Sequence, residues 1–239
     1  MAHGSQRGFT LAEMLVSMLV AAVFGLTGFG FYRSELRTLT DQSAMLDATE
    51  KIRGSMGFLT RELHQTGYDP MFTAMVVPGS KGIVDAGPNY LWIQFDANGN
   101  GAIDPSATDP NAESILYTYD AANQQVVRTV AGVAQPLVKN VPAGGFSFQY
   151  FDLLGNQLSP ASSPPSLPSS LTSQLPSSVL SVITNGSTQT LNAAQRDLVA
   201  LVRINVQVQV VGTPLAPTSP PVLRLSERVV VPSRILDRL

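Results

Sequence analysis

The chain has 239 residues, of which 13% are charged, and a formal net charge of −2 at pH 7. It lacks the excess of basic residues with which proteins bind nucleic acids, so we expect no DNA or RNA partner. The absence of cysteine and the presence of only two histidines exclude disulfides, thiolate nucleophiles and the usual zinc sites. Beyond one membrane helix, the length leaves room for about one soluble domain.

The N-terminus is a short polar leader followed by an apolar run. The leader ends at Gly8, and the run extends from Phe9 to Tyr32 with a single ionisable side chain, Glu13. At ~1.5 Å per residue, a helix of this length crosses a ~30 Å hydrocarbon core. The run contains no lysine or arginine, so a carboxylate that is costly in lipid needs a cationic partner from elsewhere. This pattern predicts a membrane-spanning helix over residues 9–32 with a functional acid near its start.

The string Gly8-Phe9-Thr10-Leu11-Ala12-Glu13-Met14-Leu15-Val16 resembles the class III signal of type IV prepilins and type II secretion pseudopilins. The resemblance implies that a membrane prepilin peptidase cuts after Gly8 and N-methylates Phe9. It also implies that Glu13 pairs with the terminal amine of a neighbouring subunit. Electrostatics agree with this role, because an amine and a carboxylate enter an apolar core at least cost when they neutralise each other.

Two ordinary interpretations of the N-terminus compete with a prepilin signal. A secretory signal peptide has an apolar region of about 7–15 residues with the cleavage site after it. Here the run is longer, and the only plausible cleavage site precedes it. A plain membrane anchor is consistent with the length but leaves Glu13 unexplained.

After Tyr32 the sequence becomes amphipathic without a break. No proline occurs before Pro70, and the apolar residues recur at helical spacings of three, four and seven: Leu36, Leu39, Leu46, Ile52, Met56, Leu59 and Leu63. Polar residues that include Arg61 and Glu62 are assigned to the other faces. The pattern predicts one spine helix from about Phe9 to His64, within a spine segment of residues 9–66. Its first half lies in lipid, and its second half packs on a soluble domain.

Residues 67–239 are expected to form a β-rich head. Period-two alternation and turn residues predict strands over residues 90–95, 115–119, 125–130, 146–150, 202–210 and 226–231. Short links make a mainly antiparallel sheet the expected arrangement. A Pro/Ser-rich loop is expected at residues 159–178 and a second Pro-rich loop at 212–221. The predicted fold is therefore α+β, with a long helix covering one sheet in the ladle shape of type IV pilins.

A loop after the first of these strands has the spacing of a calcium-binding loop. Glycine stands at position six, as in the first part of an EF-hand loop, and the candidate ligands follow alternation: Asp96, Asn98, Asn100, Ala102 through its carbonyl, and Asp104. Position twelve is Ala107, so Asp109 or Glu113 would have to complete the site. The alternative is a plain Asn/Gly turn. Two asparagines in place of aspartates predict weak affinity, in the range of about 10⁻⁴–10⁻³ M.

No motif for catalysis is present, and we expect no enzyme activity. The layout resembles PilW-type minor pilins and the J-type minor pseudopilins of type II secretion. This resemblance implies a subunit held in the inner membrane with its head in the periplasm, then moved into a surface filament. Its partners would be prepilin peptidase, other major and minor pilins, and a tip adhesin. The alternatives are a minor pseudopilin of a secretion machine and a membrane-anchored, calcium-dependent adhesion or ligand-binding module.

Overall fold

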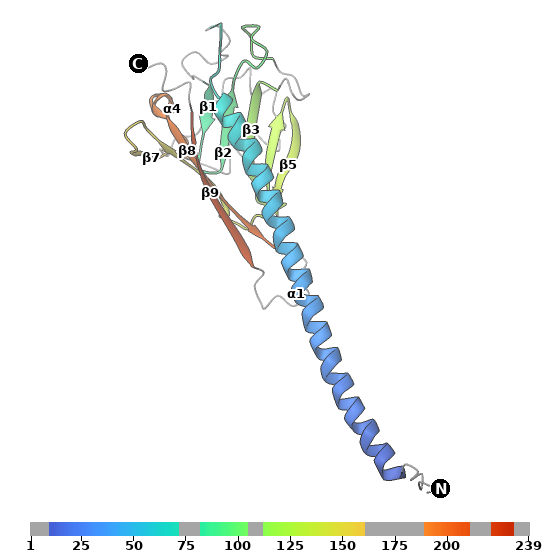
Figure 1. Cartoon of the computed structure of the whole chain (residues 1–239). Helices are drawn as coiled ribbons and strands as arrows, with labels where there is room; N and C mark the ends of the chain where they lie inside the picture. The colour runs from blue at the N-terminus through green and yellow to red at the C-terminus, as the bar shows by residue number, and fades with distance from the viewer. Residues whose placement is uncertain (1–9, 72–81, 105–111, 161–188, 211–220, 232–239) are drawn as a thin grey trace, which may run out of the picture.

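The protein is a long helix with a β-rich head at its C-terminal end (Figure 1). The computed structural model describes residues 10–71, 82–104, 112–160, 189–210 and 221–231. Within these ranges the predicted α+β ladle is confirmed, with one long helix, α1 (Leu11–Gln65), rising from a free N-terminal half into the head. The Pro/Ser-rich loop lies outside the described residues except for its first two positions.

Local signals set both ends of α1. At the start, the Thr10 side chain accepts a hydrogen bond from the Glu13 backbone N–H, and the Glu13 carboxylate accepts one from the Thr10 backbone N–H. This reciprocal capping box satisfies donors that the first helical turn leaves unpaired. At the far end, Gly67 adopts φ +76° and donates its N–H to the Gln94 carbonyl. Glycine adopts this left-handed backbone at little cost, so the chain can turn from the helix into the head.

The head contains two antiparallel sheets, whereas the sequence pattern predicted one. The first is a five-stranded meander of β1 (Ile83–Ala86), β2 (Tyr90–Gln94), β3 (Ser114–Asp120), β4 (Gln125–Val130) and β5 (Val133–Lys139). The second has the order β7-β6-β8-β9, from β6 (Phe146–Phe151), β7 (Gln157–Leu158), β8 (Leu201–Gln209) and β9 (Val222–Val230), and a short helix, α4 (Ala193–Leu198), precedes β8. The prediction of a single sheet was therefore wrong.

The strand predictions were largely correct in position and incomplete in number. The hairpin of β3 with β4, the strand β6 and the alternating strand β8 form where the pattern placed them. The strands β1, β5 and β7 and the helix α4 were missed, and β9 begins at Val222 rather than Ser226. A proline, Pro136, lies inside β5, which is largely exposed, so this edge strand carries a weak sequence signal.

The head covers only the last part of α1. Ile52, Met56, Leu59 and Leu63 are buried, and the helix lies against β9 on one side and β5 on the other. The expectation that Leu36, Leu39 and Leu46 also pack on the head was wrong, because all three are exposed. Leu36 and Leu39 precede the part of the helix that faces the head, which begins near Ala44, and Leu46 lies exposed on that part.

The two sheets meet through the turn between β1 and β2. The Phe148 N–H on β6 donates to the Pro88 carbonyl at 2.8 Å, and the Tyr150 hydroxyl donates to the Gly87 carbonyl at 2.7 Å. The inward-facing residues of β8 pack into the same buried cluster as the helix residues Met56 and Leu59. Helix and sheets thus share one hydrophobic core, which fixes the direction in which α1 leaves the head.

Candidate functional site

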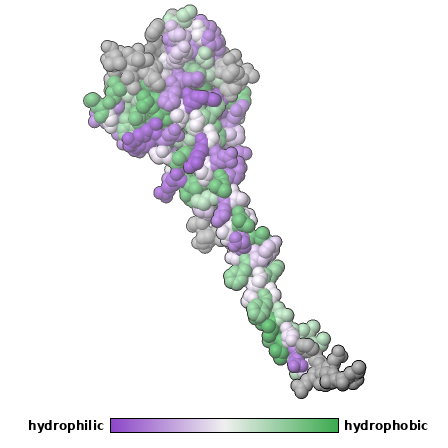
Figure 2. All heavy atoms as spheres, in the orientation of Figure 1, coloured by the Kyte–Doolittle hydropathy of each residue, from purple (hydrophilic) through white to green (hydrophobic). Residues whose placement is uncertain are grey.

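The N-terminal half of α1 is an apolar surface that the head does not cover. Every residue from Thr10 to Leu36 is exposed, including Leu11, Met14, Leu19, Phe24 and Phe31. Figure 2 shows mostly apolar side chains along this part of the helix and a mixture of hydrophilic and apolar ones on the head. The helix is long and apolar enough to cross a membrane, and none of its most apolar stretch is buried by the chain itself. Such a surface needs lipid or other protein subunits as its surroundings.

Glu13 lies in the first turn of this exposed helix. Its Oε2 accepts hydrogen bonds from the Thr10 backbone N–H and the Thr10 hydroxyl, both at 2.9 Å. Its Oε1 has no partner among the residues that the structure describes. A negative charge is stabilised at a helix N-terminus by the helix dipole. The carboxylate is therefore oriented by its own chain and keeps one oxygen available to a cation. Gly8 and Phe9 lie outside the described residues.

The candidate calcium loop folds around two buried carboxylates. Asp96 accepts the N–H groups of Gly99 and Gly101 at 2.6 and 2.9 Å. Glu113, at the start of the following strand hairpin, accepts the N–H groups of Ala97, Asn98 and Asp104. The loop is thus closed by hydrogen bonds from its own backbone.

The remaining candidate ligands converge on Asp104. The side-chain amides of Asn98 and Asn100 donate to Asp104 Oδ2 at 2.8 and 2.9 Å, and the Ala102 N–H donates to Asn100 Oδ1. In the described part of the chain, no group of three or more His, Asp or Glu side chains is arranged to hold a metal ion. Asp109 lies outside that part. Calcium binding therefore stays a prediction, and the hydrogen bonds alone account for a stable Asn/Gly turn.

Calcium at millimolar concentration is expected to raise the melting temperature of the head. A Kd of about 1 mM and about 5 mM calcium give a stabilisation of about 1 kcal/mol, or about 3 °C for a domain of this size. The measurement is a thermal scan of the full chain in detergent with calcium, with magnesium and with neither. Asp104→Asn should remove this shift in melting temperature. If calcium does not change the melting temperature of the wild-type chain, the loop is a plain Asn/Gly turn that does not bind calcium.

A buried ion pair that the sequence reasoning missed fastens α1 to the first sheet. Arg128 on β4 donates from Nη2 to Glu62 Oε1 at 2.7 Å and from Nε to both carboxylate oxygens at 3.1 and 3.2 Å. The Tyr117 hydroxyl on β3 donates to the same carboxylate, and the Arg128 guanidinium lies 5.2 Å from the centroid of the Phe58 ring. Glu62 is 5% exposed, so its assignment to a solvent-facing side of the helix was wrong.

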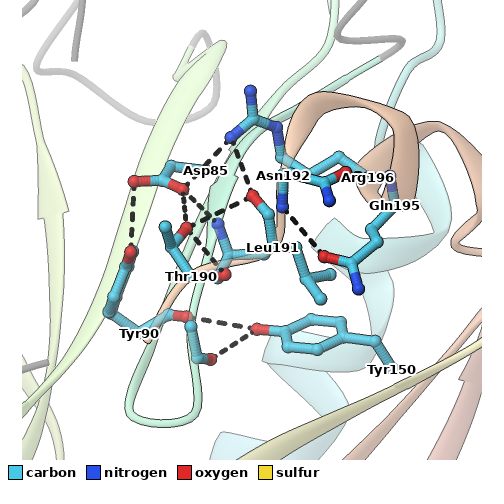
Figure 3. Close-up of polar contacts among 10 residues, drawn as sticks. Asp85, Tyr90, Tyr150, Thr190, Leu191, Asn192, Gln195 and Arg196 are labelled. Carbon is cyan, nitrogen blue, oxygen red and sulfur yellow. Dashed lines mark hydrogen bonds and ion pairs between the residues drawn. The ribbon is translucent and has the colours of Figure 1, made fainter. Parts of the chain in front are cut away.

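A second buried network holds α4 against β1 (Figure 3). Asp85 accepts hydrogen bonds from the Thr190 hydroxyl at 2.5 Å and the Tyr90 hydroxyl at 3.1 Å, and it pairs with Arg196 at 3.3 Å. Burial, with the nearby Asp85 carboxylate, raises the pKa of Tyr90, and burial raises the pKa of Tyr150 as well. Both tyrosines therefore remain hydroxyl donors at neutral pH. The network is a structural clamp, because its hydroxyl and carboxylate groups bond one another inside the head, while the Arg196 Nε has no hydrogen-bond partner among the described residues.

Comparison with known families finds a local match at the N-terminus. Residues 4–29 match the family described as the prokaryotic N-terminal methylation motif. No curated protein and no solved structure matches the chain. The matched residues include Gly8, Phe9, Glu13 and most of the exposed apolar helix. This match, together with the fold, supports a type IV pilin-like or pseudopilin-like protein that is processed by prepilin peptidase and anchored in a membrane before it joins a filament.

Proposed function

We propose that the chain is a minor subunit of a type IV pilus, one that primes assembly or lies near the tip with other minor pilins. In this role it is structural and carries no catalytic activity. The observation that carries the proposal is the exposed apolar half of α1, with Glu13 at its start and the methylation motif across it. A head with two sheets on a single spine is large for a repeating subunit, which favours a minor, PilW-type component.

The proposed assembly step follows from the environment of Glu13. In the membrane and then in the filament core, the Phe9 amine of one subunit neutralises the Glu13 carboxylate of its neighbour. Pairing between the two lowers the cost of holding either charge in an apolar surrounding. Because Thr10 orients the carboxylate, the neighbour's amine would approach Glu13 Oε1, which has no partner among the described residues, and this favours one register along the filament axis. The head would then recruit other minor pilins or a tip adhesin.

The same N-terminal features also serve the minor pseudopilins of type II secretion, in which the filament stays in the periplasm. Sheared surface filaments separate the two alternatives. A pilus subunit is expected in the sheared fraction, whereas a pseudopilin is expected only in the envelope fraction, together with a defect in the export of a folded protein when the chain is deleted.

Removal of the leader is the first property to test. Intact mass measurement of the protein from envelopes is expected to show a chain that begins at N-methylated Phe9. Gly8→Ala should leave the leader attached, because the peptidase acts at that glycine. Gly4→Ala, which changes the other glycine of the leader, is the matched control and should be processed normally. A wild-type chain that begins at Met1 or Ala2, or that is cut beyond Tyr32, would overturn the proposed function.

A further inference from the structure

The outward face of the second sheet is a regular polar surface that no described helix or strand covers. On β8, Val202, Ile204 and Val206 point into the core, so the alternate residues point outward. The register places the outward residues in rows across β6, β8 and β9: Phe151–Leu201–Val230, Gln149–Arg203–Arg228, Ser147–Asn205–Ser226 and Gln207–Arg224. This face therefore has an apolar row at one end, with an arginine row directly beside it.

The arginine row contains an unfavourable pairing. Arg203 and Arg228 are direct cross-strand partners, and Arg224 lies on the same face further along β9. None of the three forms an ion pair with an acidic residue in the described part of the chain. Like charges directly opposite each other in a sheet destabilise it. By contrast, the polar side chains of the neighbouring row form hydrogen bonds with one another, because Asn205 bonds both Ser147 and Ser226.

Arg203 is held in a fixed orientation. Its guanidinium lies 5.0 Å from the centroid of the Phe151 ring and donates from Nη1 to Gln149 Oε1 at 3.3 Å. An arginine that is already ordered loses less conformational entropy when it binds a carboxylate with its planar N–H groups. Arg228 is exposed beside it. The pair thus offers two guanidinium groups, one pre-oriented, to a single acidic side chain.

The adjacent apolar row defines the kind of partner. Phe151 and Leu201 are half-buried, and Val230 is 40% exposed. Aromatic and arginine residues next to a small apolar surface are the typical composition of a protein–protein interface. Three arginines without a lysine on the face, in a chain of net charge −2, form too small a basic surface for a nucleic-acid backbone. A lipid surface is disfavoured, because a stretch of exposed helix separates the head from the apolar part of α1 (Figure 1).

We propose that this face, formed by Phe151, Leu201, Arg203, Arg228 and Val230, docks a segment of a second protein that alternates acidic and apolar side chains. The acidic residue is bound by Arg203 and Arg228, and the apolar residue next to it covers the Phe151–Leu201–Val230 row. The unfavourable arginine pairing is relieved only when the partner is in place. This inference goes beyond the filament role, and it holds or fails independently of the residue at which the mature chain begins.

The test uses a fluorescent twelve-residue peptide of alternating glutamate and leucine, titrated with the full chain in neutral detergent micelles. The double variant Arg203→Gln/Arg228→Gln is expected to weaken binding at least about tenfold. Arg53→Gln/Arg61→Gln removes the same charge from an exposed side of α1 and should change affinity less than about twofold. Because all variants share the same micelles, partition of the peptide into detergent cancels in the comparison.

A stability measurement separates docking from a structural role. Arg228→Glu places an acid opposite Arg203, so it should abolish peptide binding while the melting temperature stays the same or rises. Peptide binding by Arg228→Glu at the wild-type level would overturn the proposal. An equal loss of peptide affinity in Arg203→Gln/Arg228→Gln and in Arg53→Gln/Arg61→Gln would overturn it too. Two further results would also overturn it: tighter binding of a single-stranded DNA of equal charge, or self-association of the chain through the same arginines in place of peptide binding.

Discussion

Replacing Arg128 by leucine is expected to lower the free energy of unfolding of the head by about 3–5 kcal/mol, the cost of removing one partner from a buried ion pair. The Glu62 carboxylate would stay inside the interface between α1 and the first sheet without the guanidinium that binds both of its oxygens. The Tyr117 hydroxyl would still donate to it, but a neutral donor compensates a buried charge only partly.

Trp92 makes this loss measurable. It is the only tryptophan of the chain and lies buried on β2, one strand away from Tyr117. Its fluorescence during urea unfolding of the full chain in detergent therefore reports on the head. The matched control is Lys51→Leu, which removes the partner of Asp47 from an exposed ion pair on the same helix. Pairs of this kind contribute little, so the control should unfold close to the wild-type midpoint.

The double variant Glu62→Leu/Arg128→Leu distinguishes an ion pair from two independent polar residues. Apolar side chains in place of a whole buried pair often leave stability unchanged or raise it. The double variant should therefore be more stable than Arg128→Leu alone, with a large coupling between the two sites. The prediction would be contradicted if the double variant lost as much free energy of unfolding as the two single variants lose together. Without the pair, the direction of α1 relative to the head would rest on apolar packing and on the remaining hydrogen bonds, such as the one from the Ser55 hydroxyl to the Leu137 carbonyl at 2.8 Å.

The sequence was sufficient for features that depend on local periodicity. The unbroken helix from Leu11 to Gln65, the β3–β4 hairpin and the alternation along β8 all follow from spacings of 3.6 and two residues. The methylation motif was also recognisable, because it is a contiguous string with one acid in an apolar run. These signals do not depend on which residues, distant in sequence, pack against the segment in the folded protein.

Features that depend on contacts distant in sequence could not be predicted in the same way. Glu62 lies between Leu59 and Leu63 on the buried side of α1, and Arg128 lies between the core residues Val126 and Val130 on β4. Each position, taken alone, shows a charge on an apolar face, which is a usable warning that the charge is paired inside the protein. The identity of the partner and the division of the strands into two sheets depend on contacts across the fold, for which local patterning carries no signal.

The role of Glu13 gives the second large expected effect. Glu13→Leu should leave peptidase processing and membrane insertion intact, since leucine is more favourable than glutamate in lipid. It should nevertheless reduce the incorporation of the subunit into filaments to about one-tenth or less. The physical reason is the neighbour's Phe9 amine, which would enter the apolar core without a counterion at a cost of about 2.5–3.5 kcal/mol, roughly a hundredfold in an equilibrium.

Two comparisons make the Glu13 result specific. Glu35→Gln removes an acid from the same helix outside the apolar run, and it should leave incorporation unchanged. Thr10→Val removes the hydroxyl that donates to Glu13 Oε2 while it keeps the charge, so it should reduce incorporation less than Glu13→Leu. The measurement is the ratio of this subunit in sheared filaments to that in envelopes, with N-terminal mass to verify processing. A normal ratio for Glu13→Leu would show that the carboxylate only caps its own helix through Thr10, and the amine would then need a counterion from another subunit.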